Sequence, residues 1–120
     1  MNLNININLT NEQKAFVDST KQFADEHIKN NSLKWDKNAY FPVEVFKKSA
    51  ELGLAGIYVS EKDGGTGLTR LDASLIFEEL AYACPSTSAF LSIHNMTAWM
   101  LSKYGNCLLY TSDAADEVVR

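Results

Sequence analysis

The sequence predicts an all-α domain, and three observations support this prediction. Only two prolines and six glycines occur in 120 residues, so little in the chain interrupts long helices. The segments Thr10–Gln13 and Thr69–Asp72 both have the capping-box pattern with which many helices begin. Apolar residues recur at helical spacing after both boxes and after Pro42 and Pro85. Because hydrophobic residues make up 46% of the chain, it can build one domain with a modest core.

The first half of the chain contains two expected helices. Residues 1–9 alternate Asn with Leu or Ile, and we expect an extended lead-in there because Asn is a poor strand former. The first helix is expected over residues 11–29. The second begins at Pro42, which needs no N–H partner in a first turn, and ends near Gly53, which suits a left-handed C-cap. The expected inner faces are Phe16, Val17, Thr20, Phe23, Ala24, His27 and Ile28 in the first helix, and Val43, Phe46 and Ala50 in the second.

Two connections in the chain have distinct compositions. The stretch before Pro42 is polar but contains two side chains of a buried type, Leu33 and Trp35. The sequence "GGTG" at 64–67 precedes a helix, as phosphate-binding loops do. However, the dinucleotide fingerprint would need glycine where Arg70 stands, and the Gly-Lys-Ser/Thr of a P-loop is absent. We therefore expect a tight turn with positive φ angles.

The second half contains two further helices. The third follows Thr69, and the fourth spans residues 86–104 after Pro85 and ends at Gly105. The expected inner face of the third helix consists of Ala73, Ile76, Phe77, Leu80 and Ala81.

The fourth helix has two strips of apolar or small residues, so we expect it to be covered on more than one side. In the second strip, Ser88, Ser92 and Met96 follow each other at intervals of four residues. Small side chains at this spacing suit either close helix–helix packing or the wall of an apolar pocket, and spacing alone leaves both alternatives open. The first strip consists of Ala89, Phe90, Ile93, Thr97, Met100, Leu101 and Tyr104.

Charge and composition argue against several classes of protein. The net charge is −4 and the pI is about 5.1, whereas a nucleic-acid binder or a protein of anionic membranes needs a basic face. The sequence contains no run of eighteen apolar residues, so it predicts no membrane span. The segment "MNLNININLT" resembles neither a signal peptide nor a transit peptide. The two cysteines, Cys84 and Cys107, lack metal-binding spacing, and reduced thiols in the cytoplasm are expected.

The titratable residues form no recognisable catalytic motif. The only histidines, His27 and His94, have no second ligand at metal-binding spacing. Glu78 and Glu79 are adjacent and point about 100° apart on a helix, so they cannot act as a carboxylate pair. We therefore expect no catalytic residue and no metal site in this chain.

Four segments together resemble one known family. The sequences "LTNEQKAF", "FPVEVFKKSAELGLAGIYV", "GGTGLTRLDASLIFEELAYAC" and "SIHNMTAWMLSKYGN" resemble, in order and spacing, the N-terminal helical domain of acyl-CoA dehydrogenases. The resemblance extends from Leu9 to Asn106, which places the domain at residues 10–106. "GLTRLDASLIFEELA" followed by "SIHNM" is most similar to the isobutyryl-CoA dehydrogenase branch, which acts in valine breakdown.

The resemblance implies an FAD-dependent oxidoreductase. Such enzymes take a proton from the α-carbon of an acyl-CoA and pass a hydride from the β-carbon to the flavin, and electron-transfer flavoprotein then accepts the electrons. The family is homotetrameric, and its flavin contacts and catalytic glutamate lie mainly in later domains. The resemblance therefore implies a fragment that is inactive alone, located in a bacterial cytoplasm or, in a eukaryote, the mitochondrial matrix. It also implies that one set of residues lines the acyl pocket: Ser88, Ala89, Ser92, Ile93 and Met96.

The end of the chain departs from the family. Residues 107–120, "CLLYTSDAADEVVR", resemble the in-frame translation of an adaptor used in sequencing libraries, and we expect a non-native tail there. Two rival functions stay open from the sequence. One is a related acyl-CoA oxidase or flavin monooxygenase on the same scaffold, and the other is a helical interaction module without enzymatic activity.

Overall fold

The computed structural model describes residues 8–105, so most of the expected lead-in and the whole expected tail, with Cys107, lie outside the described residues. The described part is helical and contains no strand, which confirms the all-α prediction. None of its helices combines the length and hydropathy needed to cross a bilayer. The elements are α1 (Asn11–His27), α2 (Ser32–Lys37), α3 (Val43–Glu51), the 3₁₀ turn η1 (Glu61–Asp63), α4 (Arg70–Ala83) and α5 (Pro85–Tyr104).

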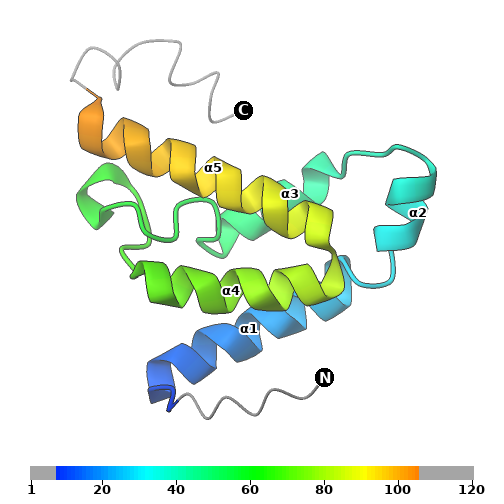
Figure 1. Ribbon diagram of the computed structural model, residues 1–120, viewed down its shortest axis with the longest axis horizontal. Coiled ribbons are helices and arrows are strands. Elements are labelled where there is room, and N and C mark those ends of the chain that lie inside the picture. Colours follow the sequence, from blue (N-terminus) through cyan, green and yellow to red (C-terminus); the bar gives the residue numbers. More distant parts are fainter. Residues whose placement is uncertain (1–7, 106–120) are drawn as a thin grey trace.

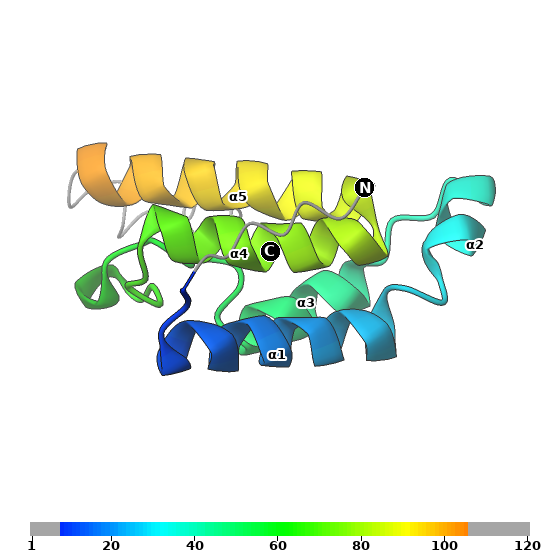
Figure 2. The same ribbon diagram turned by 60° about the horizontal axis from the view of Figure 1, so that its bottom comes forward.

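Helix α4 is the central element of the fold. It lies between α1 and α5 (Figures 1 and 2), and α3 lies on the same side of α4 as α1 in Figure 2. The predicted inner face of α4 is confirmed, since Ala73, Ile76 and Leu80 are buried in the core. Leu75 and Ala83 are buried as well, because neighbouring helices cover α4 on two sides. The core cluster consists of Phe23, Ala24, Ile28, Val45, Leu54, Ile57, Ala73, Ile76, Leu80, Ala83, Cys84 and Leu91.

Both predicted capping boxes are present. The Thr10 hydroxyl accepts a bond from the Gln13 N–H at 3.1 Å, and the Gln13 side-chain oxygen accepts one from the Thr10 N–H at 3.0 Å. Thr69 and Asp72 make the same pair of bonds at 3.1 and 3.0 Å. The Gln13 Nε2 also donates to Asp72 Oδ1 at 2.9 Å, a bond that sequence pattern did not predict. The two boxes are therefore joined, and this contact fixes the start of α1 beside the start of α4.

Asp72 should make the stability of the domain depend on pH in acid solution. The side-chain bond from Gln13 and the backbone N–H of Thr69 hold the pKa of Asp72 below its ordinary value. The resulting stability is complete above the unfolded-chain pKa of about 3.9 and is lost as the pH falls through the lower folded-state pKa. The free energy of unfolding in urea should therefore fall on acidification. Asp72→Asn should reduce the slope of that fall, and equal slopes for the two proteins would contradict this role.

Three sequence predictions about the first half are corrected by the structure. The polar connection contains a short helix, α2, that was not predicted. Leu33 on α2 is 85% exposed and is not an anchor, whereas Trp35 packs against the core as predicted. The inner face of α3 was predicted wrongly at two positions: Val43 and Ala50 are exposed. Phe46 is half-buried, and the core-facing residues are Val45 and Ser49.

The correction in α3 has a physical reason. The Ser49 hydroxyl donates to the Phe46 carbonyl at 2.7 Å, so the helix satisfies this polar group internally and Ser49 can be buried. Hydrophobic periodicity overlooks such a residue. The predicted end of α3 is confirmed, because Gly53 follows the helix with φ +82°. Helix α1 ends at His27, two residues before the predicted end, although its predicted face is confirmed by the burial of Thr20, Phe23 and Ala24.

Candidate functional site

Helix α5 turns a mixed face toward the core and an apolar face outward. Its core side contains Leu91, which is 2% exposed, and Asn95, which is completely buried. Much of the first predicted strip is exposed: Ile93 is 60% exposed and Met100 is 49% exposed. We call the outward side the outer surface of α5, formed by Ala89, Phe90, Ile93, Met96, Met100 and Tyr104.

The five residues predicted to line a pocket have different positions in the structure. Ala89, Ile93 and Met96 are exposed and belong to the outer surface of α5. Ser92 is half-buried at its edge, and its hydroxyl donates to the Ala89 carbonyl at 2.8 Å. Ser88 is only 6% exposed, and its hydroxyl donates to the Phe77 carbonyl of α4 at 2.8 Å. The structure thus brings three of the residues together, keeps Ser92 beside them and turns Ser88 toward α4.

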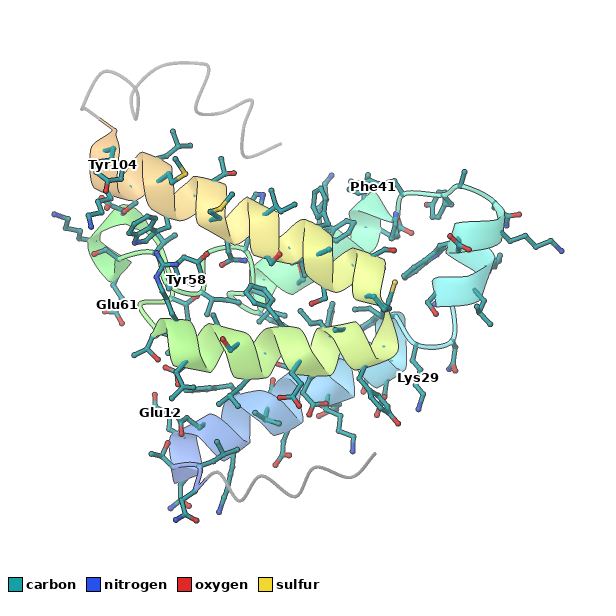
Figure 3. The ribbon with its side chains drawn as sticks, viewed as in Figure 1. Glu12, Lys29, Phe41, Tyr58, Glu61 and Tyr104 are labelled. Atoms are coloured by element: carbon teal, nitrogen blue, oxygen red, sulfur yellow. The ribbon has the colours of Figure 1, made fainter. Side chains whose placement is uncertain are left out.

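An aromatic cluster continues the outer surface of α5 toward α3. The ring of Phe90 lies 4.9 Å from Phe41 and 4.4 Å from Phe46, measured between ring centroids, and the last two rings are 4.7 Å apart. Figure 3 shows Phe41 near the start of α3 and Tyr104 at the other end of α5. These rings line a groove of about 340 Å³ between α2, α3 and the start of α5. Helical periodicity identified Phe46 and Phe90 as apolar face residues but did not indicate Phe41, which lies in the connection before Pro42.

The opposite end of α5 carries stacked cationic side chains. The Arg70 guanidinium lies 4.7 Å from the Tyr58 ring centroid and 4.5 Å from that of Trp99. The ammonium of Lys103 lies 5.0 Å from the Trp99 centroid. Cation–π contacts at these distances stabilise the charged groups on ring faces. They attach the start of α4 to the last turns of α5.

Both histidines pack beside phenylalanine rings, and His27 Nε2 also lies 3.7 Å from the Glu26 carboxylate. His27 packs on Phe23 with ring centroids 5.1 Å apart, which confirms its prediction as a packed residue, and His94 lies 6.4 Å from the Phe90 ring. Within residues 8–105, no three potential ligand side chains gather as a metal site would require. Burial raises the pKa of Glu79, opposed by nearby Lys21, but this carboxyl is on α4 and not on the outer surface of α5. What the outer surface offers is apolar contact area.

Comparison with known proteins assigns this arrangement to a family. The family described as "Acyl-CoA dehydrogenase, N-terminal domain" matches residues 10–107. The chain belongs to the acyl-CoA dehydrogenase family. It is 52% identical over 102 residues to the mitochondrial isobutyryl-CoA dehydrogenase of Dictyostelium discoideum and 44% identical over 98 residues to that of Bos taurus. These matches cover 85% and 82% of this chain and 24% of each relative.

Two further relatives show the breadth of the family and its fold. An acryloyl-CoA reductase (NADH) of Anaerotignum propionicum is 33% identical over 101 residues, which cover 84% of this chain and 26% of the reductase. The crystal structure of a nitrososynthase from Micromonospora carbonacea var. africana superposes with a TM-score of 0.69 at 30% identity. That match covers 89% of this chain and 30% of the nitrososynthase. The chain thus spans about a quarter of the length of the curated acyl-CoA dehydrogenase relatives.

Proposed function

We propose that this chain is part of an FAD-dependent acyl-CoA dehydrogenase that oxidises isobutyryl-CoA or a similarly short, branched acyl-CoA. The observation that carries the proposal is the 52% identity to an isobutyryl-CoA dehydrogenase, which extends over 102 residues of this chain. The complete protein would remove hydrogen from the α and β carbons in valine breakdown. Electron-transfer flavoprotein would accept the electrons, and the enzyme would be a homotetramer.

In this proposal, the outer surface of α5 forms one wall of the acyl pocket. Ala89, Ile93 and Met96 supply apolar area for the acyl group, and Ser92 limits the space at the edge. Exposed apolar side chains of this size and continuity are expected where a protein binds a ligand or another domain. Ser88 contributes indirectly, because its hydroxyl bonds to α4 and leaves little surface for a ligand.

In this proposal, the described residues contribute no complete flavin site. A flavin dinucleotide needs hydrogen-bond donors for its pyrophosphate, whereas the outer surface of α5 is apolar. We therefore propose that FAD is held mainly by the rest of the protein and that the 120-residue chain is inactive by itself. When bound, the flavin accepts the hydride from the β-carbon. The residues of this chain contribute binding area and the exclusion of water.

The likeness to a nitrososynthase is the observation that favours one alternative function. A related acyl-CoA oxidase or flavin monooxygenase could use the same helical scaffold, since a nitrososynthase shares this fold at 30% identity. A helical module without enzymatic activity is the other alternative. The higher identity to two isobutyryl-CoA dehydrogenases favours the dehydrogenase.

Two further expectations belong to the same proposal. We place the complete enzyme in the mitochondrial matrix if its source is a eukaryote, and in the cytoplasm if it is a bacterium. The names of two relatives describe those proteins as mitochondrial. We also propose that residues 107–120 are not native. Sequencing the source locus from unamplified DNA tests this directly: an open frame that continues after Asn106 with family-like sequence supports it, and the present codons followed by a stop refute it.

A substitution on α5 should change the preferred acyl chain of the complete enzyme. Met96→Ala removes three heavy atoms from the proposed wall. The kcat/KM for straight or longer acyl-CoA esters should therefore rise relative to that for isobutyryl-CoA. Since each methylene of fit is worth about 10-fold or more in discrimination, we expect a change of about 10-fold in the ratio of kcat/KM values. Lys47→Ala, an exposed change on α3, is the matched control. An unchanged ratio of kcat/KM values in Met96→Ala would contradict the proposal that α5 forms a wall of the acyl pocket.

A further inference from the structure

A line of polar side chains runs along the inner side of α5. Ser88, Asn95 and Ser102 are spaced seven residues apart, a spacing that places them on one side of a helix. Each side chain donates a hydrogen bond to a different part of the molecule. The acceptors, in chain order, are the Phe77 carbonyl of α4 at 2.8 Å, the Leu54 carbonyl at 2.8 Å, and the Asp63 carboxylate of η1 at 2.5 Å. We call these three residues the polar seam of α5.

Asn95 is the central member of the polar seam. It is completely buried, and its side-chain oxygen accepts a bond from the Ile57 N–H at 2.6 Å. Its Nδ2 donates to the Leu54 carbonyl and to the Leu91 carbonyl, both at 2.8 Å. The amide thus joins α5 to the segment after α3 by bonds in both directions. Because hydrogen bonds tolerate only a few tenths of an ångström, they fix both the rotation and the axial position of α5.

The direction of the outer surface follows from these bonds. Each residue of an α-helix adds a rotation of 100° and a rise of 1.5 Å, so a slip of α5 by one residue would replace every outward side chain. A slip would also break the two bonds between Asn95 and the segment 54–57. Leu91 is the only large apolar residue of α5 that is fully buried among those described. The hydrogen bonds of the polar seam therefore add a specific restraint to the packing of Phe90 on Phe46 and of Trp99 on Arg70.

We propose that the polar seam, and Asn95 above all, positions the acyl-binding wall and so helps determine which acyl chain the enzyme accepts. This inference rests on the proposed function. Asn95 does not face the ligand: it is a positioning residue that acts through the direction in which Ile93 and Met96 point. Its replacement should therefore change substrate selectivity by more than the loss of stability explains.

The test compares selectivity at equal loss of stability in the complete enzyme. Asn95→Asp keeps the acceptor for Ile57 but loses both donated bonds, and Ser88→Ala is a milder change that preserves folding. Phe23→Leu, in the interface between α1 and α4, is the matched control. The ratio of kcat/KM for isobutyryl-CoA over butyryl-CoA should fall by about fivefold in Asn95→Asp and about twofold in Ser88→Ala, and stay unchanged in Phe23→Leu. If the ratio follows the melting temperature instead, or does not change in either seam variant, the proposal is wrong.

A second readout separates failure of this inference from failure of the proposed function. An unmodified enzyme that oxidises neither ester would overturn the proposed function and, with it, the role of the seam in substrate choice. The role of the polar seam in holding α5 is tested by hydrogen exchange of the Ile57 amide in the 120-residue chain. This amide should exchange slowly in the unmodified chain. Exchange that is at least about 10-fold faster in Ser88→Ala or Asn95→Asp than in Phe23→Leu would support the role of the polar seam in holding α5. Equal exchange in all variants would show that the seam does not hold the helix.

Discussion

Gly65→Ala should destabilise the domain by about 3 kcal/mol or more, because a side chain at this position has no space. A Cβ atom there would lie 2.5 Å from the carbonyl carbon of Val59 and even nearer to its oxygen. The backbone cannot move away easily. Gly67 donates to the same Val59 carbonyl at 2.9 Å, and Leu68 donates to the Ile57 carbonyl at 2.8 Å, so the turn is tied to the core segment beside it.

The neighbouring glycine provides the control for this prediction. Gly64 has φ +88°, and a Cβ on it would meet no atom within 4 Å. Gly64→Ala should therefore cost only the strain of a left-handed residue, about 1–2 kcal/mol. Urea denaturation of both variants measures the difference. Equal losses of stability would show that positive φ, and not the close approach to Val59, determines the need for glycine in this turn.

Asn95→Ala should lower the free energy of unfolding by about 3–5 kcal/mol, since it leaves buried polar groups without partners. The Ile57 N–H and the Leu54 carbonyl both lose their bond to the amide, in a place that is completely buried. Neither group belongs to a helix that could satisfy it.

Thr97→Ala is the matched control on the same helix. Thr97 is exposed, and its hydroxyl bonds at 3.0 Å only to the Ile93 carbonyl one turn earlier in α5. Its removal should change stability by at most about 0.5 kcal/mol. Similar losses in both variants, measured by urea denaturation, would contradict the central role of the Asn95 amide.

The sequence allowed much of the fold to be predicted, because local signals determine where these helices begin. The two capping boxes, Pro85 and Gly53 all mark helix ends in the structure as predicted. The predicted face of α4 is also right, since apolar side chains dominate a helix packed on two sides. At these helix ends and on this face, the local sequence was sufficient to predict the structure.

The inner side of α5 could not be predicted from hydrophobic periodicity. That side includes Ser88 and Asn95, which are buried because other elements supply their hydrogen-bond partners. The partners of Asn95 lie 38 and 41 residues earlier in the chain, so no local pattern indicates them. The apolar strip that periodicity identified is the exposed side, and this is expected if that side is reserved for a ligand or for the rest of a larger protein. The residues proposed for the acyl wall were found through resemblance to a family, and spacing alone did not distinguish them from ordinary packing.

The most direct measurement is made on the complete protein encoded by the source gene. Purified enzyme should contain a flavin, and its absorbance should bleach when isobutyryl-CoA is added in the absence of oxygen. Electron-transfer flavoprotein should then restore the oxidised spectrum. A protein without flavin, or a flavin that NAD(P)H reduces while isobutyryl-CoA and other short acyl-CoA esters leave it oxidised, would contradict the assignment as an acyl-CoA dehydrogenase of short, branched substrates.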